Sequence, residues 1–137
     1  MKIRRLEKPE QGKFVQTPKS NDSKPDREYP AFSLRYLSPE WCITNCDRDG
    51  KAAFADRIRI LSQKSWLEIT SLPRHGQGFE KIPRDKIKAG IPQHITEDVK
   101  SFWAFRFHGK APMVGYKDGE IFHVLWFDPS FKLYDHN

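Results

Sequence analysis

Polar side chains in the C-terminal third have the types and spacing for acid–base chemistry on a phosphate. Lys132, Tyr134 and His136 alternate along the chain, so an extended tail would place all three on one side. Histidine exchanges protons near neutral pH, and Tyr or Lys side chains stabilise developing charge. Arg106 interrupts an aromatic run, and arginine binds phosphate through paired hydrogen bonds. These groups could cleave RNA through its own 2′-hydroxyl, without a metal ion.

Each of these residues also has an ordinary structural interpretation, and the sequence leaves both open. Arg106 could be a solvated strand residue, and the tail could be a polar chain end. His123 lies between Phe122 and Val124, where a lone histidine is usually a hydrogen-bonded core residue. Tyr116 falls on the same predicted face, which predicts a hydrogen bond between Tyr116 and His123.

The motifs of cofactor and metal enzymes are absent from the sequence. Cys42 and Cys46 have metal-ligand types but no second pair and no close histidine, so we expect two half-buried thiols and no bound metal. The segment His75-Gly76-Gln77-Gly78 is followed by strand-forming residues rather than a helix, which argues against a phosphate loop. We therefore expect no cofactor.

The strands that would position these groups are clearest near the C-terminus. Apolar alternation predicts strands over 101–107, 111–117 and 121–127, with a turn at His108-Gly109 and a last short strand over 131–134. Asp118-Gly119 predicts a two-residue type I′ hairpin turn. This turn would pair Lys117 with Glu120, Tyr116 with Ile121, and Val114 with His123. Alternation also places His123 on one face with Ile121, Leu125 and Phe127.

The N-terminal half predicts helices that follow one strand. Alternation predicts a strand over 32–37, and helical spacing predicts a helix over 50–62, with Arg57 and Arg59 near its polar side. Ser65 and Glu68 have the spacing of a capping box, which opens a short helix through Leu72. A strand over 79–82 and a helical turn over 86–90 follow.

Length and composition indicate one packed domain. The chain has 137 residues, 13% of them aromatic, and a net charge of +6. Residues 1–30 hold four prolines and eight Lys/Arg against five Asp/Glu, so we expect an extended basic arm there and one domain over 31–137. The element order predicts an α+β fold: two N-terminal helices on one face of a twisted antiparallel sheet, with the other face partly open to a ligand.

The C-terminal third resembles the sheet of RelE/ParE-type bacterial toxins. The resemblance rests on Phe105-Arg106-Phe107, the turn over 117–120 and Leu133-Tyr134, and Leu61-Ser62 with 66–69 resembles the second helix of that family. It covers about residues 50–137. The segments 122–129 and 133–136 are similar to little-characterised proteins of toxin–antitoxin type.

The resemblance implies catalytic roles for Arg106, Tyr134 and His136, because basic sheet residues and a C-terminal Tyr or His act on the scissile phosphate in the RNase members. Lys81 and Lys110 match basic sheet positions. We expect further nucleic-acid contacts from Lys132 and His123, which gives four binding residues: Lys81, Lys110, Lys132 and His123.

The resulting expectation is the toxin of a type II toxin–antitoxin pair in the cytoplasm, away from membranes. It would engage RNA or the ribosome, pair with an antitoxin protein, and act as a metal-independent endoribonuclease if it is an enzyme. The alternative is a non-catalytic module that binds nucleic acid or protein. Asp128-Pro129 favours this alternative, because it stands where the family commonly carries an arginine.

Overall fold

The computed structural model describes residues 28–73 and 79–136. The arm expected over 1–30 lies outside the described residues except for 28–30, and the loop 75–78 lies outside them entirely. In the described part of the chain, no helix is long and apolar enough to cross a membrane.

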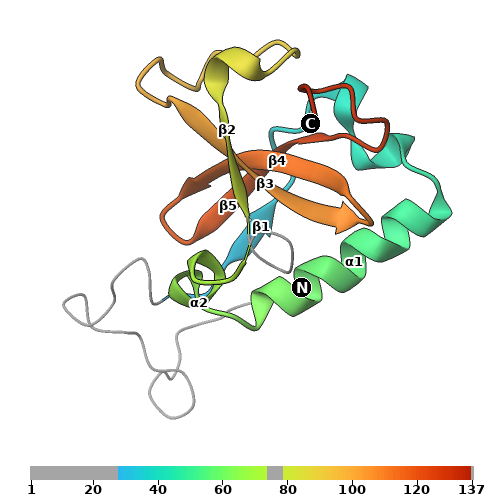
Figure 1. Cartoon of the computed structure of the whole chain (residues 1–137), viewed down its shortest axis with the longest axis vertical. Coiled ribbons are helices and arrows are strands. Elements are labelled where there is room, and N and C mark those ends of the chain that lie inside the picture. The colour runs from blue at the N-terminus through green and yellow to red at the C-terminus, as the bar shows by residue number, and fades with distance from the viewer. Residues whose placement is uncertain (1–27, 74–78, 137) are drawn as a thin grey trace, which may run out of the picture.

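Five strands form one mixed, mostly antiparallel sheet (Figure 1). Their order across the sheet is β1-β5-β4-β3-β2. The outer strand β1 runs parallel to β5, and every other neighbouring pair is antiparallel. The strands are β1 (Ala31–Ser33), β2 (Glu80–Pro83), β3 (Ser101–His108), β4 (Ala111–Asp118) and β5 (Ile121–Phe127).

Two helices lie on one face of this sheet, which confirms the α+β prediction. Helix α1 (Arg48–Ser62) begins after Asp47, whose carboxylate accepts a hydrogen bond from the Gly50 amide at 2.8 Å. Helix α2 (Trp66–Thr70) begins with the expected capping box, because Ser65 and Glu68 each accept the other's amide hydrogen. Such a cap contributes about 1 kcal/mol to helix stability.

The helices cover a core built on the odd-numbered residues of β3. Trp103, Phe105 and Phe107 pack there, as alternation predicts. Trp66 of α2 is fully buried, and its Nε1 donates a hydrogen bond to the Glu120 carbonyl at 3.0 Å. This contact ties the shorter helix to the β4–β5 turn.

The expectation that the second sheet face is partly open was wrong. A second buried cluster covers this face, built on Phe102, Val114, Leu125 and other strand residues. Its cover comes from irregular segments that carry Trp41, Ile95 and Leu133 rather than from helices. Figure 1 shows these segments and the C-terminal tail on the side of the sheet opposite α1 and α2.

Both hairpin turns lie one residue later than predicted. Gly109 and Gly119 have positive φ values of 61° and 66°, and each occupies the first position of a two-residue loop. Type I′ turns need positive φ at both central positions, whereas only the glycine has it here, as in type II′ turns. The expected pairs were therefore wrong; the observed pairs are Asp118 with Ile121, Lys117 with Phe122, Tyr116 with His123, and Val114 with Trp126.

Three other element predictions need correction. The strand expected over 32–37 is only Ala31–Ser33, after which the chain turns to cover the second sheet face. The helical turn expected over 86–90 is a 3₁₀ turn at Arg84–Lys86. No strand forms over 131–134, because Asp128 folds this segment into a loop.

Candidate functional site

The tail loop, residues 128–136, is organised by one buried carboxylate. Asp128 is 1% exposed and accepts hydrogen bonds from the backbone amides of Lys132 at 2.8 Å and Leu133 at 2.9 Å. The Leu133 carbonyl in turn accepts a hydrogen bond from the Lys88 amide at 2.8 Å. A buried carboxylate is tolerated when such donors satisfy it. Asp128 therefore holds the loop closed instead of facing a ligand.

Phe131 is a strained and exposed aromatic residue in this loop. Its φ is +59°, and it is the one non-glycine residue of the described chain with positive φ. A bulky residue in this region costs about 1–2 kcal/mol. The side chain is 44% exposed, so burial does not compensate for much of this cost. Backbone strain that the surrounding structure enforces is characteristic of functional positions.

Tyr134 and His136 stack on each other in the same loop. Their ring centroids are 4.1 Å apart at an interplanar angle of 26°, and the Phe131 ring meets His136 edge-on at 5.2 Å. His136 Nε2 lies 3.5 Å from Asp128 Oδ2, which forms an ion pair when the imidazole is protonated. Tyr134 and His136 thus lie on one side, as alternation predicts, but they do so in a folded loop rather than in an extended tail.

Burial raises the pKa of the Tyr134 hydroxyl to about 12, with smaller contributions from the charges of Glu80 and Asp128. The positive charge of Arg106 acts in the opposite direction and lowers this pKa. Tyr134 therefore keeps its proton at neutral pH and can donate a hydrogen bond or a proton.

Arg106 and Arg57 form a pair of like charges, here called the edge arginines. Arg106 lies between two residues of the helix-side core, so it points to the face that carries Tyr134. Strand β2 pairs with β3 only as far as Ala104, so Arg106 has β4 on one side and no paired strand on the β2 side among the described residues. Arg57 comes from α1, on the helix side of the sheet.

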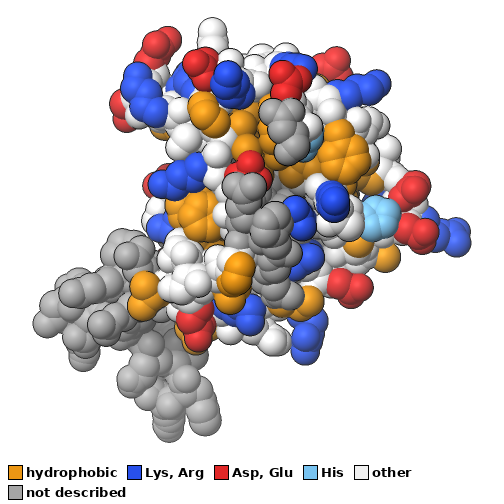
Figure 2. Space-filling view, viewed as in Figure 1, with side chains coloured by type: hydrophobic (Ala, Val, Ile, Leu, Met, Phe, Trp, Pro, Cys, Tyr) orange, Lys and Arg blue, Asp and Glu red, His pale blue; other side chains and the backbone are white. Residues whose placement is uncertain are grey.

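The edge arginines repel each other. Burial lowers the pKa of Arg57, and the charge of Arg106 lowers it further. Among residues 28–73 and 79–136, the ion pairs are Lys88–Asp135 and His136–Asp128, so neither edge arginine has a carboxylate partner there. Figure 2 shows Lys and Arg side chains across the middle of the view, where β3 and α1 lie in Figure 1. Two unpaired guanidinium groups are suited to an anion.

The other predicted binding residues are more scattered. Lys132 is exposed in the tail loop, and Lys110 is exposed in the β3–β4 turn. Lys81 pairs with Trp103 and thus points to the helix side of the sheet, away from Tyr134. The structure brings Tyr134 and His136 together, with Lys132 in the same loop, and Arg106 points to the sheet face that carries Tyr134.

His123 belongs to a different cluster, at the β4–β5 hairpin. Tyr116 stacks on His123 at 4.9 Å, and Tyr36 lies 5.3 Å from His123 and 4.1 Å from His94. The predicted hydrogen bond between Tyr116 and His123 is not formed; the Tyr116 hydroxyl instead hydrogen-bonds to His94 Nε2 at 2.9 Å. Burial lowers the pKa of His123. Alternation predicts Tyr36 in a strand over 32–37, but no pattern in the sequence predicts its contacts with His94 and His123, because these residues come from distant segments.

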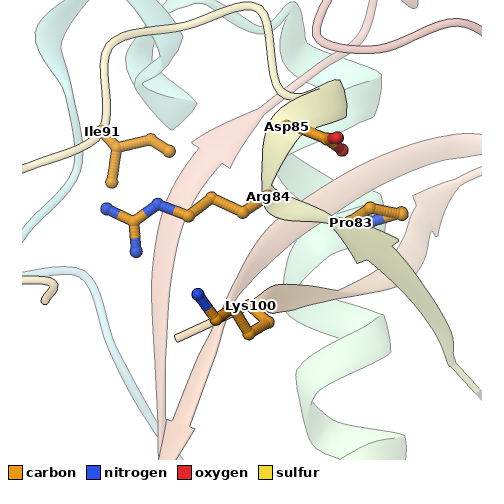
Figure 3. A pocket seen from close by; sticks show the side chains of 5 residues that line it. All are labelled: Pro83, Arg84, Asp85, Ile91 and Lys100. Atoms are coloured by element: carbon orange, nitrogen blue, oxygen red, sulfur yellow. The ribbon is translucent and has the colours of Figure 1, made fainter. Parts of the chain in front are cut away.

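A surface hollow of about 580 Å³ lies beside Arg84 and Lys100 (Figure 3). The Arg84 guanidinium donates hydrogen bonds to the carbonyls of Thr96 at 2.5 Å, Val99 at 3.0 Å and Ile95 at 3.2 Å. This arginine is therefore occupied in anchoring the 95–99 loop, and we do not assign the hollow a ligand.

Within the described ranges, no group of three or more His, Cys, Asp or Glu side chains could hold a metal ion. Cys42 and Cys46 are free thiols, the first half-buried and the second buried.

No family model, curated protein or solved structure matches this chain.

Proposed function

We propose that the protein binds RNA through phosphate contacts at the edge arginines and the tail loop. The observation that supports this proposal is the pair Arg57 and Arg106, two guanidinium groups without a carboxylate partner in the described chain, with the charge of Arg106 acting on Arg57. Their repulsion opposes folding, and a bound phosphate would relieve it. Phe131 offers an exposed ring for base stacking, and Lys132 adds positive charge beside it.

The proposal includes RNA cleavage without a metal ion, by a toxin of RelE/ParE type. His136 would accept the proton of the 2′-hydroxyl, whose oxygen forms a bond to phosphorus. The bond from phosphorus to the 5′-oxygen then breaks, and Tyr134 would donate a proton to that oxygen. The products would be a 2′,3′-cyclic phosphate and a 5′-hydroxyl. An antitoxin protein and the ribosome are the partners that this proposal implies.

A binding role without cleavage is the second candidate. The carboxylates of Asp128 and Glu80 lie close enough to raise the pKa of Tyr134, and negative charge there would repel a scissile phosphate. Mapping of RNA 5′ ends during induced expression separates the two candidates. New ends that depend on His136, together with growth arrest, support cleavage, and RNA binding without new ends supports a binding module.

The binding proposal is tested by titrating a labelled single-stranded RNA of mixed sequence with the full chain at several salt concentrations. Arg106→Gln should weaken binding about tenfold and reduce the salt slope by about one. Lys81→Gln is the matched control, because it removes one positive charge on the opposite sheet face. If both variants weaken binding equally, the edge arginines are not the binding site.

A further inference from the structure

A second hollow, of about 310 Å³, lies on the other side of the tail loop. One wall is the segment before α1, with 3₁₀ turns at Pro39–Trp41 and Ile43–Asn45, and the other is the end of β5 with the start of the tail loop. Figure 1 shows the tail beside this segment. The hollow is lined in part by Glu40, Trp41, Cys42, Asn45, Phe127 and Lys132. Its volume suits a small ligand.

The walls of this hollow are fixed by hydrogen bonds. Asn45 Nδ2 donates to the carbonyls of Pro39 at 3.1 Å and Glu40 at 3.2 Å, which closes the two 3₁₀ turns on each other. The Asn45 amide group is thereby oriented, and its oxygen remains an acceptor. On the opposite wall, Phe127 and Asp128 are buried, and Asp128 accepts hydrogen bonds from the Lys132 and Leu133 amides. The hollow is thus a preformed feature of the fold.

The lining combines flat apolar surface with acceptors and a cation. Trp41 and Pro129 offer apolar surface to a planar ring, whereas the Phe127 ring is buried in the helix-side core. The Glu40 carboxylate and the Asn45 oxygen accept hydrogen bonds, and Lys132 donates them. A guanine base has two adjacent N–H donors and a carbonyl oxygen on one edge, whereas adenine lacks the paired donors.

We propose that this hollow binds a guanine base of single-stranded RNA, with Glu40 accepting the two N–H donors of its edge. The inference rests on the proposed function and names the nucleotide that the RNA site would select. Asp128 lines the hollow, and its carboxylate also lies beside His136. The hollow and His136 thus both adjoin Asp128, so the proposed base site and the proposed phosphate groups lie on one loop.

Alkylation of Cys42 reports whether the hollow is occupied. Cys42 lines it, whereas Cys46 is buried, and hydrogen bonds from Thr44 lower the pKa of the Cys42 thiol. Guanosine 5′-monophosphate at four times its Kd should slow iodoacetamide labelling about fivefold. Adenosine 5′-monophosphate at the same concentration should not slow it. Equal protection by both nucleotides, or protection by neither up to millimolar concentration, overturns the proposal.

Two variants link this protection to Glu40. Glu40→Gln should abolish protection by the guanine nucleotide, because an amide presents only one acceptor atom. Glu97→Gln is the matched control, since Glu97 is exposed and does not line the hollow. Retained protection in Glu40→Gln contradicts the assigned role of the carboxylate.

The failure of this inference can be distinguished from failure of the proposed function. If Arg106→Gln weakens binding of mixed RNA but no nucleotide protects Cys42, the RNA site remains and the guanine hollow is wrong. If guanosine monophosphate protects Cys42 but Arg106→Gln leaves RNA binding and its salt slope unchanged, the phosphate edge is wrong.

Discussion

At the scale of single residues, Phe131 has the left-handed backbone conformation that loops usually reserve for glycine. The left-handed conformation costs a phenylalanine about 1–2 kcal/mol relative to glycine. We expect the free energy of unfolding of Phe131→Gly to exceed that of Phe131→Ala by at least about 0.5 kcal/mol. Both variants lose the ring, but only alanine keeps the backbone strain. Urea denaturation of the two variants measures this difference.

RNA binding by the wild type and the two Phe131 variants tests whether the ring has a function. If Phe131 is kept for stacking on RNA bases, both variants should bind RNA more weakly, by about 1–3 kcal/mol. Unchanged RNA binding in both variants would leave the strain of Phe131 without a role at the proposed interface.

His123 makes a pH-dependent contribution to stability. Burial lowers its pKa from 6.5, the charges of His94 and Arg35 lower it further, and Asp118 acts in the opposite direction. The unfolded chain therefore binds a proton more readily than the folded one. The free energy of unfolding should fall as the pH decreases below about 6.5, until the pH passes the lowered folded pKa.

His123→Gln removes this titration, so denaturation at pH 7.5 and pH 5 should show a smaller difference in the variant than in the wild type. The ring neighbours Tyr36 and Tyr116 remain in place and control for loss of the cluster. An equal pH dependence in both proteins would assign the effect to other groups.

At the residue scale, the sequence predicted part of the candidate site. Arg106, Tyr134 and His136 were selected from alternation and from the resemblance, and Tyr134 and His136 lie together. Arg57 was placed on the polar side of its helix. The spacing instead predicts Arg57 on the apolar side of the helix, because Arg57 follows Phe54 by three residues and precedes Leu61 by four.

At the scale of elements, the β4–β5 hairpin shows what alternation alone misses. The register shifts between Val114 and Gly115, so Leu125 is an extra residue on β5. This bulge moves Phe127 to the helix-side core, although strict alternation placed it on the face of His123. No local sequence signal marks the bulge except Gly115, whose missing side chain leaves room for the partner strand.

Gly115 is therefore a critical position of the sheet. A Cβ atom there would lie 1.9 Å from the His123 carbonyl oxygen, a contact that the backbone cannot accommodate without moving. Gly115→Ala should lower the free energy of unfolding by about 3 kcal/mol. Gly90→Ala is the control, because nothing lies within 4 Å of its added Cβ, and its effect should stay within about 0.5 kcal/mol. Denaturant titration measures the free energy of unfolding of both variants. Similar losses in the two would contradict the role of Gly115 in the close approach of β5.

At the scale of the whole molecule, the class of fold followed from the order of elements, but the cover of the second sheet face did not. Tyr36, Trp41, Ile95 and Leu133 come from separate segments, and the short alternation around Tyr36 and Leu133 predicts strands there rather than a cover for the sheet. Long-range packing of this kind leaves no pattern in a single sequence. The same segments form the guanine hollow and the ring cluster, which is why the sequence did not predict either one.

The two cores share β3, β4 and β5, so the molecule should unfold as one cooperative unit. Leu133 is fully buried and belongs only to the second core. Leu133→Ala should lower the global free energy of unfolding by about 3 kcal/mol. The amide of Ile69, which bonds to the Ser65 carbonyl in α2, lies beneath the first core and reports on the other side of the sheet. Its hydrogen-exchange free energy should fall by the same amount, because exposing either core separates the shared strands. An unchanged exchange rate at Ile69 would mean that the helix layer remains folded when the tail side opens, and the tail loop would then be a separately unfolding cover.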